Sequence, residues 1–387
     1  MNNSFTKMKI EKIISDLISF KSISEYENLS LINYISNYLS SFSIKSKVLN
    51  GEKDRANLYA RIGPDVKGGI MLSGHTDVVP VNGQPWQTEP FNLKVLDNKL
   101  FGRGTSDMKS FIAIILYIVP QIIVSKLKKP IHLMFSYDEE IGCIGIQKAI
   151  PFIDSLKRKP SACIVGEPTE MKLINQHKGK KNFRVEFQGL ESHSSNILGG
   201  VNAITFAAKF VLYLLKKEEE LKKNYKKDLK YDPPYATINI GKFNGGIALN
   251  IIPRNCIVEF ELRDLPNTNS EGIISEIKNH LFSNLEKKMK SLDSSCFIKF
   301  NVTNNFPPLK TAENKEIVNL CMNCLETNEI GAVSFGTEAG VFNNSGIETI
   351  VCGPGSINEA HKPNEYIDIT QVKKCEIFLQ KIIQTLY

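Results

Sequence analysis

The chain has 387 residues, of which 42% are hydrophobic and 23% charged, a composition typical of a globular protein large enough for more than one domain. The formal net charge is +7, but many lysines fall within 214–230, where glutamates interleave with them. This pattern indicates the solvated face of a helix and not a phosphate-binding stripe, so we expect no nucleic-acid partner.

The chain opens with an amphipathic segment. Apolar residues recur at helical spacing and predict a helix over 10–18. Acidic residues in this segment and the lack of a small-residue cleavage site argue against a signal or transit peptide. The most apolar run, 111–124, is too short to span a bilayer and carries Pro120. We therefore expect a buried helix there and no membrane partner.

Short apolar runs alternate with helical patterns in the first half of the chain. The runs at 68–74, 131–137 and 162–167 predict strands. A helix is predicted between the first two runs, within 111–124. This alternation predicts an α/β domain with a mostly parallel sheet flanked by helices.

The pattern changes near residue 180. Runs at 181–190, 235–246 and 256–266 alternate between apolar and polar residues, as half-buried antiparallel strands do. Helical patterns lie between and after these runs, at 200–220 and 270–289. We therefore expect a compact α+β sandwich inserted into the α/β domain.

The α/β pattern resumes after the Pro-Pro pair at 307–308. The expected domains are a catalytic domain at 1–179 and 307–387, interrupted by the sandwich at 180–306. Hinges near 178–181 and 305–310 follow from this division, because the chain crosses between domains there.

Eight cysteines are scattered without the spacing of a disulfide framework, which fits a reducing compartment and a cytoplasmic location. Cys321 and Cys324 form a C-x-x-C motif inside a helical pattern at 314–327. Because no second cysteine pair accompanies them, we expect packing and not zinc binding or redox chemistry.

Polar residues follow the ends of successive apolar runs, and ligands of open α/β sheets bind at the carboxyl ends of strands. Taken singly, each has an ordinary interpretation: Glu139 and Glu140 as solvated surface, Glu167 as a helix cap. Together they would form a cluster of like charges that only cations stabilise. Imidazoles and carboxylates without thiolates suit catalytic zinc, cobalt or manganese. The candidate residues are His75, Asp77, Asp107, Glu139, Glu140, Glu167 and His361.

Five segments resemble, in order and spacing, the motifs of the metallopeptidase M20 family, which includes acetylornithine deacetylases, succinyl-diaminopimelate desuccinylases and carboxypeptidase G2. The resemblance covers nearly the whole chain. It implies the M20 fold, with the insert as a dimerisation (lid) domain, and a homodimer. The matching segments are "SGHTDVVPV" (73–81), "GRGTSDMKS" (102–110), "DEE" (138–140), "GEPT" (166–169) and "GPGSINEAHKPNEY" (353–366).

The resemblance implies two divalent ions per chain, zinc or cobalt. His75 and Glu167 would bind one ion, and Glu140 and His361 the other. Asp107 would bridge the two, and the peptide bond that follows it would be cis.

Two further acidic residues match catalytic positions of the family. Asp77 matches the residue that hydrogen-bonds His75 and sets its tautomer. Glu139 matches the general base, which takes a proton from the attacking water and passes it to the leaving amine.

The inserted domain also carries matches. His193 in "GLESHSSN" resembles a histidine that reaches across the dimer to stabilise the tetrahedral oxyanion. Without the motif it would be an exposed polar turn. Asn250 and Arg263 match positions that hold the substrate carboxylate, a group that a guanidinium pairs with bidentately. Gly336 and Thr337 resemble a carboxylate grip on the catalytic domain.

The surroundings of the matched motifs favour hydrolysis of N2-acetyl-L-ornithine to L-ornithine and acetate, a step of arginine biosynthesis. The alternatives are another N-acyl amino acid, N-succinyl-diaminopimelate or a dipeptide as substrate. A peptidase-like binding protein without catalysis is a further alternative. All proposed ligands and the base are present, which favours an enzyme.

Overall fold

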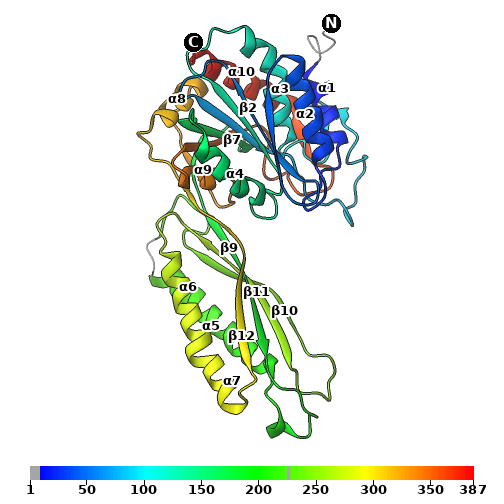
Figure 1. Ribbon diagram of the computed structural model, residues 1–387, viewed down its shortest axis with the longest axis vertical. Helices are drawn as coiled ribbons and strands as arrows, with labels where there is room; N and C mark the ends of the chain where they lie inside the picture. The colour runs from blue at the N-terminus through cyan, green and yellow to red at the C-terminus, as the bar shows by residue number, and fades with distance from the viewer. Residues whose placement is uncertain (1–8, 225–226) are drawn as a thin grey trace. The chain divides into compact units, whose positions relative to one another are not determined.

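The computed structural model describes residues 9–224 and 227–387, and the chain divides into two compact units (Figure 1). The first unit contains the described residues up to His177, with Leu309–Ala332 and Thr337–Tyr387. The second unit contains Lys178–Pro308 and Val333–Gly336. Residues 333–336, which we expected in the catalytic domain, therefore group with the second unit.

Parts of two predicted segments lie outside the described residues. These parts are residues 1–8, at the start of the segment judged not to be a targeting peptide, and residues 225–226 in the lysine-rich stretch.

The first unit is built on a mixed sheet with the strand order β1-β2-β6-β3-β7-β15-β8-β13, and β14 pairs with β8. The four central strands, from β6 to β15, run parallel, and the pairs towards both edges are antiparallel. A smaller sheet joins β16, β5 and β4. The bounds are β1 Ser46–Asn50, β2 Ala56–Ile62, β3 Ile70–His75, β4 Lys94–Leu96, β5 Lys99–Phe101, β6 Ile131–Ser136, β7 Ala162–Pro168, β8 Ile174–His177, β13 Leu309–Lys310, β14 Gly331–Val333, β15 Glu348–Gly353 and β16 Tyr366–Asp368.

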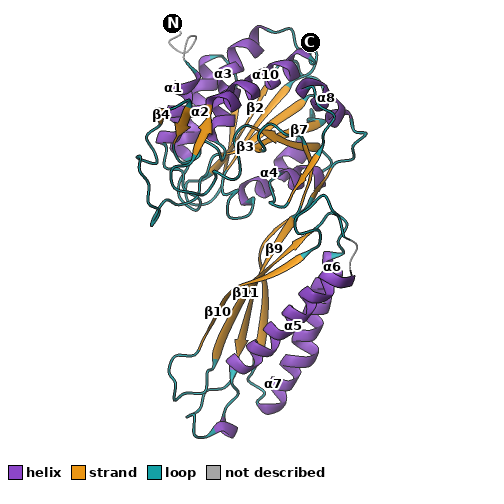
Figure 2. Cartoon of the chain, turned by 180° about the vertical axis from the view of Figure 1, so that it is seen from behind, coloured by secondary structure: helices purple, strands orange, loops and turns teal. Residues whose placement is uncertain are grey.

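Helices cover both faces of the main sheet (Figures 1 and 2). On one face α3 contacts α1, α2 and α10, and α10 contacts α8; on the other, α4 contacts α9. The bounds are α1 Ile10–Ser19, α2 Leu29–Ser41, α3 Lys109–Val124, α4 Ile144–Ser155, α8 Glu316–Leu325, α9 Ala339–Asn344 and α10 Ile369–Gln384.

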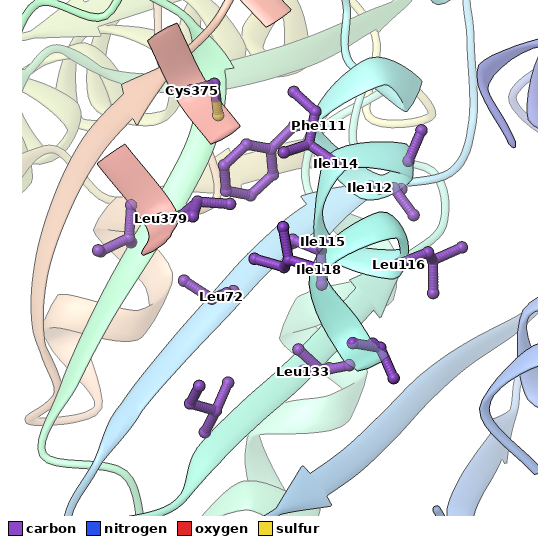
Figure 3. Packing of buried hydrophobic residues seen from close by; sticks show 14 of the residues in the cluster. Leu72, Phe111, Ile112, Ile114, Ile115, Leu116, Ile118, Leu133, Cys375 and Leu379 are labelled. Carbon is purple, nitrogen blue, oxygen red and sulfur yellow. The ribbon is translucent and has the colours of Figure 1, made fainter. Parts of the chain in front are cut away.

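The core of the first unit lies between the sheet and α3. Strands β3, β6 and β7 are buried at every residue, which explains their nearly continuous apolar sequence. Figure 3 shows isoleucines of α3 beside Leu72 of β3 and Leu133 of β6, with Leu379 of α10 also in the cluster. The most apolar run is buried over nearly all of 111–119, as predicted, and ends in exposed Ile123 and Val124. No helix among residues 9–224 and 227–387 has the length and apolar character needed to cross a membrane.

The cysteines lie inside the fold. All eight are buried, and none forms a disulfide. Cys321 and Cys324 lie on α8 within the hydrophobic core. The prediction that this C-x-x-C pair serves packing is confirmed.

The second unit is an antiparallel sheet of order β10-β11-β9-β12 covered by helices. Buried and half-buried residues alternate along β9, and Phe183 and Phe187 pack in the aromatic core with Phe260 and Phe210. The strands are β9 Gly179–Gln188, β10 Thr237–Gly245, β11 Asn255–Asp264 and β12 Phe297–Phe306, and the helical segments are η1 Ile197–Gly199, α5 Ala203–Asn224, α6 Ser270–Asn279, η2 His280–Glu286 and α7 Lys287–Leu292.

Two details of the second unit differ from the sequence prediction. Strand β12 was missed because it is an edge strand in which Lys299 and several asparagines interrupt the apolar alternation. The helix predicted over 270–289 contains a π-helical stretch, η2, between α6 and α7. The predicted fold class is confirmed, with a parallel central sheet and a separate antiparallel sheet.

Candidate active site

Parallel register brings the candidate residues of the first unit to one edge of the sheet. His75 ends β3 and pairs with Ser136, the last residue of β6, so the "DEE" segment begins two residues beyond that point. Glu167 lies at the end of the next strand, β7. Asp107 precedes α3, and His361 follows β15 in a loop. The carboxyl ends of three neighbouring parallel strands therefore supply most of the cluster, as expected for an open α/β sheet.

Asp107 lies between the two histidines. Its Oδ1 is 2.9 Å from His75 Nε2, and its Oδ2 is 3.2 Å from His361 Nε2. Glu167 Oε1 lies 3.7 Å from His75 Nε2, and Glu140 Oε2 lies 3.0 Å from His361 Nε2. The peptide bond between Asp107 and Met108 is cis, as the resemblance implies. The sequence-predicted ligands are thus brought together as two groups that share Asp107.

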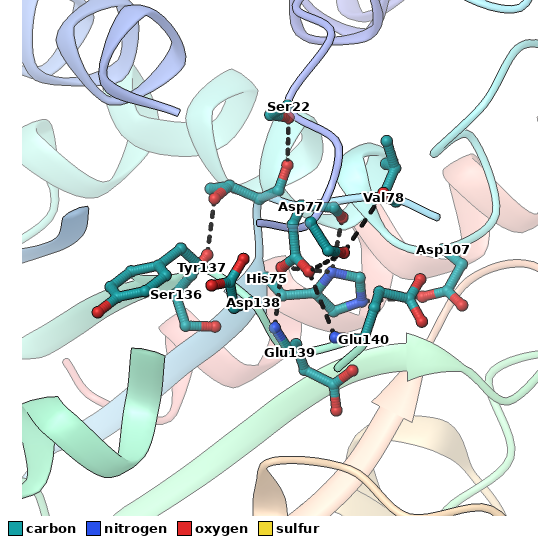
Figure 4. Close-up of polar contacts among 12 residues, drawn as sticks. Ser22, His75, Asp77, Val78, Asp107, Ser136, Tyr137, Asp138, Glu139 and Glu140 are labelled. Carbon is teal, nitrogen blue, oxygen red and sulfur yellow. Dashed lines mark hydrogen bonds and ion pairs between the residues drawn. The ribbon is translucent and has the colours of Figure 1, made fainter. Parts of the chain in front are cut away.

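Asp77 contacts His75 through its backbone and the "DEE" segment through its side chain. His75 Nδ1 lies 2.9 Å from the backbone carbonyl oxygen of Asp77 and 3.6 Å from its carboxylate Oδ1. The carboxylate accepts the backbone N–H groups of Glu139 and Glu140 at 3.0 and 3.3 Å (Figure 4). Ser24 Oγ donates to it at 2.7 Å. The nearest acceptor for His75 is therefore the carbonyl, and the carboxylate holds the "DEE" segment in place.

Glu139 lies beside the ligand groups, and one of its carboxylate oxygens can join His75 and Glu167 within the reach of a single cation. Cys143 Sγ donates to Glu139 Oε1 at 3.2 Å. Burial raises the pKa of Glu139 to about 8, reinforced by Glu140, Asp77 and other carboxylates. Before any ion binds, Glu139 therefore holds its proton more tightly than a solvated glutamate.

The pKa values of the proposed ligands are shifted because several carboxylates lie close together out of solvent. Burial raises the pKa of Glu140 to about 7 and that of Glu167 well above its usual range, and Asp107 adds to both effects. Burial opposes the charged form of Asp107 and His75 as well. Contacts with His361 and His75 overcome it for Asp107 and lower the pKa of that carboxyl, and contacts with Asp107 and Glu167 overcome it for His75 and raise the pKa of its imidazole.

The donor set fits divalent cations. Glu167 Oε1 is buried and has no hydrogen-bond partner among the described residues, so a bound cation would satisfy it. Two groups can each place three ligand atoms around one point: His75, Glu139 and Glu167, and His75, Asp107 and Glu140. Imidazole nitrogen and carboxylate oxygen without thiolate are the ligands of catalytic zinc, cobalt and manganese centres.

Sequence reasoning missed several polar groups around this cluster. Cys143 was one, and no local signal distinguishes it from the other cysteines. Buried Glu338 accepts hydrogen bonds from Ser73 and Ser136, beneath the strand ends, at 2.5 and 2.6 Å. Its place directly after Thr337 in a motif already singled out was the available signal.

The remaining candidate residues, except Thr337, belong to the second unit. His193 is exposed, and its Nδ1 lies 2.7 Å from Ser195 Oγ. Asn250 is also exposed, and its backbone carbonyl accepts the N–H of Ser194, which places the two loops side by side. Arg263 lies on β11 and donates to Glu261 at 2.9 Å.

Gly336 and Thr337, predicted as one carboxylate grip, fall in different units. Phe306 is so close to Gly336 that a Cβ there would overlap its ring, which explains the glycine. The hydroxyl of Thr337 is buried and accepts the N–H of Ala339 at the start of α9. This contact fixes the hydroxyl locally, so a role in substrate binding stays a prediction.

Comparison with known proteins places this arrangement in a family. Residues 71–385 match the Peptidase family M20/M25/M40. The chain is 33% identical over 372 residues to an acetylornithine deacetylase of Buchnera aphidicola subsp. Acyrthosiphon pisum, covering 96% of this chain and 94% of the relative.

Two solved structures share the fold. An M20 family metallo-carboxypeptidase of Sulfolobus solfataricus aligns with a TM-score of 0.76 at 20% identity, over 98% of this chain and 99% of that one. A dinuclear metal binding peptidase of the M20 family, from Bacillus subtilis, aligns with a TM-score of 0.67 at 14% identity, over 97% of each chain. The chain therefore belongs to the M20/M25/M40 peptidase family and is a metal-binding hydrolase.

Proposed function

We propose that this chain is a dinuclear-metal amidohydrolase that removes the acetyl group from N2-acetyl-L-ornithine. The observation that carries the reaction class is the cluster of two histidines and several carboxylates, in which buried Asp107 faces both buried His75 and half-exposed His361. The substrate is supported by the 33% identity with a named acetylornithine deacetylase along nearly the whole chain.

The proposed ligands divide into two sets. His75 and Glu167 would hold one ion, Glu140 and His361 the other, and Asp107 both. Ions bound there would supply Lewis acidity to the scissile carbonyl and to the attacking water. Zinc or cobalt suits this donor set.

Glu139 is the proposed general base. It is half-buried beside both sets without being assigned to either, so its carboxylate is available to receive a proton from the attacking water. The same proton would then pass to the nitrogen of the leaving amine, which departs as ornithine while acetate forms. Burial gives Glu139 a pKa close to neutrality in the ion-free chain, and nearby cations would lower it into the ionised form that a base requires.

Residues of the second unit are proposed to complete the site. His193 would donate a hydrogen bond to the tetrahedral oxyanion, and its exposed position leaves the ring accessible. Asn250 and Arg263 would hold the substrate carboxylate, with Gly336 of the same unit and Thr337 of the first unit as further contacts. A guanidinium is suited to this role because its planar donors match a carboxylate.

Substrate choice is tested by measuring free-amine release from a panel with zinc- or cobalt-loaded protein. The panel contains N-acetylornithine, N-acetylmethionine, N-succinyl-diaminopimelate and a dipeptide. We expect the highest kcat/KM with N-acetylornithine. Preference for another member would overturn the substrate and keep the reaction class, whereas a loaded chain inactive on all four would contradict the proposed enzyme.

We also propose a homodimer formed through the second unit. Strand β10 is an edge strand, and its second half, residues 241–245, is exposed. Nearby loops expose the apolar side chains of Leu198, Ile247 and Leu249. An unpaired edge beside exposed apolar residues is a surface that a second copy would cover.

Mixing two inactive variants tests whether His193 acts across this dimer. His193→Ala and Glu139→Gln chains are unfolded together, refolded and assayed. If His193 serves the partner's site, each mixed dimer regains one complete site, and a random mixture recovers about a quarter of wild-type activity. Recovery no greater than that of the two parent variants would exclude the across-dimer role.

A cytoplasmic location completes the proposal. The eight buried, unpaired cysteines support it, since reduced thiols are typical of that compartment.

A further inference from the structure

Glu365 connects the two loops that carry Asp107 and His361. It lies four residues after His361 and is only 1% exposed. Its Oε1 accepts the backbone N–H groups of Gly104, Ser106 and Asp107 at 3.1, 2.9 and 3.1 Å. One carboxylate oxygen from the His361 loop therefore fixes the backbone of the Asp107 loop at three points.

Arg103 and Gln84 extend this connection to His361 itself. Arg103 Nη1 donates to Glu365 Oε2 at 2.7 Å and to the carbonyl of Lys362 at 3.3 Å. Its Nη2 donates to Gln84 Oε1 at 2.5 Å. Gln84 Nε2 in turn donates to the carbonyl of His361 at 2.8 Å. The contacts form a closed chain from the backbone of Asp107 to the backbone of His361.

The three side chains do not belong to the proposed ligand sets or to the proposed base. Arg103 is also 1% exposed, and its guanidinium lies 5.2 Å from the centre of the Trp86 ring. A buried carboxylate and a buried guanidinium are costly unless well paired. Here both carboxylate oxygens and both terminal guanidinium nitrogens have partners, and only Arg103 Nε has none among the described residues. Such a network suits a part of the fold in which loop position must be fixed, because its loss would leave three buried N–H groups unsatisfied.

We propose that Glu365 is a positioning residue for the metal centre, holding Asp107 and His361 at the separation that two ions require. This inference rests on the proposed function. Asp107 presents one oxygen to each histidine, so a shift of its loop would disturb both ions. Groups that orient metal ligands without touching the metal contribute about 10–100-fold to affinity.

Glu365→Gln is the principal test. The amide can accept from the three N–H groups only by turning its NH2 towards Arg103, where two donors oppose each other. Zinc affinity is measured by competition with a chromophoric chelator, together with the unfolding temperature of the chelated protein. We expect zinc affinity to fall about 10–100-fold, and kcat at saturating zinc to stay within about threefold of wild type.

Asn175→Ala is the matched control for a lost buried polar contact. Asn175 is 1% exposed and donates to the carbonyl of Thr311, away from both ligand loops in the hydrogen-bond network. We expect it to lower the unfolding temperature and leave zinc affinity unchanged. If Glu365→Gln only lowered the unfolding temperature as the control does, with wild-type zinc affinity, the residue would be structural and the inference wrong.

Gln84→Ala keeps the inference testable if Glu365→Gln does not fold, because Gln84 is not buried. It removes the hydrogen bond to the carbonyl of His361, so we expect weaker binding of the ion held by His361 and little change at the other. If Gln84→Ala kept the wild-type zinc affinity at both positions, the proposed role of the network would be wrong. A wild-type chain that binds no zinc would overturn the proposed function and this inference together, whereas two tightly bound ions in both variants would overturn this inference alone.

Discussion

The candidate residues of the two units are held in opposite ways. In the first unit, buried His75 lies 2.9 Å from Asp107 and 3.7 Å from Glu167, both also buried, in a cluster that raises the pKa of several carboxylates. In the second unit, His193 and Asn250 are exposed, and their hydrogen bonds are local. Buried like charges demand an external partner, whereas an exposed histidine bonded to a nearby serine demands none.

The geometry of the single chain supports the metal centre of the first unit more directly than the substrate contacts proposed for the second unit. In the first unit, several carboxylates lie close together where burial disfavours their charged forms. Bound cations would stabilise those charges, so the composition of the cluster already indicates a metal centre. The residues of the second unit acquire a role only through a substrate or a second copy. Substitutions in the two units should therefore differ in size and kind.

The largest effect is expected for Glu139→Gln. Loss of the general base should lower kcat about 10²–10⁴-fold, because the amide cannot accept the proton of the attacking water. Zinc content, measured by inductively coupled plasma mass spectrometry, should remain at the wild-type value.

Glu140→Gln is the comparison for this variant, since Glu140 is a proposed ligand. It should lose zinc as well as activity. If Glu139→Gln lost zinc in the same way, Glu139 would be a ligand, and the division between base and ligand would be wrong.

A smaller effect is expected for His193→Ala in the second unit. Loss of one oxyanion donor should lower kcat about 10²–10³-fold with little change in zinc content. Steady-state kinetics with N-acetylornithine measures it.

His280→Ala provides the matched control, because His280 is the other histidine of the second unit and stacks on Tyr213. It should retain wild-type kcat. If both variants kept the wild-type kcat, the second unit would contribute no imidazole to catalysis, and the proposed role of His193 would be wrong.

The smallest effect is on stability against pH. The folded, chelated chain holds protons on Glu139 and Glu140 up to pH values near their pKa values of about 8 and 7, whereas unfolded glutamates release them near 4.5. His361, with its pKa raised to about 10 by Asp107 and Glu140, acts in the same direction. The stability from these groups is present at low pH and lost as pH rises through those values.

The unfolding temperature of the chelated protein should therefore fall by several degrees between pH 6 and pH 9. Zinc-loaded protein should change less, because bound ions favour the deprotonated carboxylates. A chelated protein whose stability rises over this range would show that the carboxylates are not held as the structure has them.

Much of the first unit could be predicted because several of its candidate metal ligands stand at, or just after, the ends of strands. Buried parallel strands are mostly apolar, so the points where they end, at His75 and Glu167, are visible in the sequence. Motif order then brought in Asp107 and His361, which lie in loops.

The rest depended on contacts between distant segments. Glu365 bonds to Gly104 and Ser106, some 260 residues earlier, and no local pattern encodes such a pairing. Cys143 reaches Glu139 through the turn before α4. The sequence could not tell which oxygen of Asp77 faces His75, and in the structure it is the backbone carbonyl. Strand β12 escaped because an edge strand with one exposed face tolerates polar residues that erase the alternation.

The most direct test of the central claim is the number of ions that one chain binds. Protein stripped with a chelator is titrated with zinc and examined by native mass spectrometry, beside the His361→Ala variant. The account predicts two ions per wild-type chain and one tightly bound ion in the variant. A wild-type chain that binds no zinc, or a variant that still binds two ions tightly, would contradict the assignment of the buried cluster as a dinuclear centre.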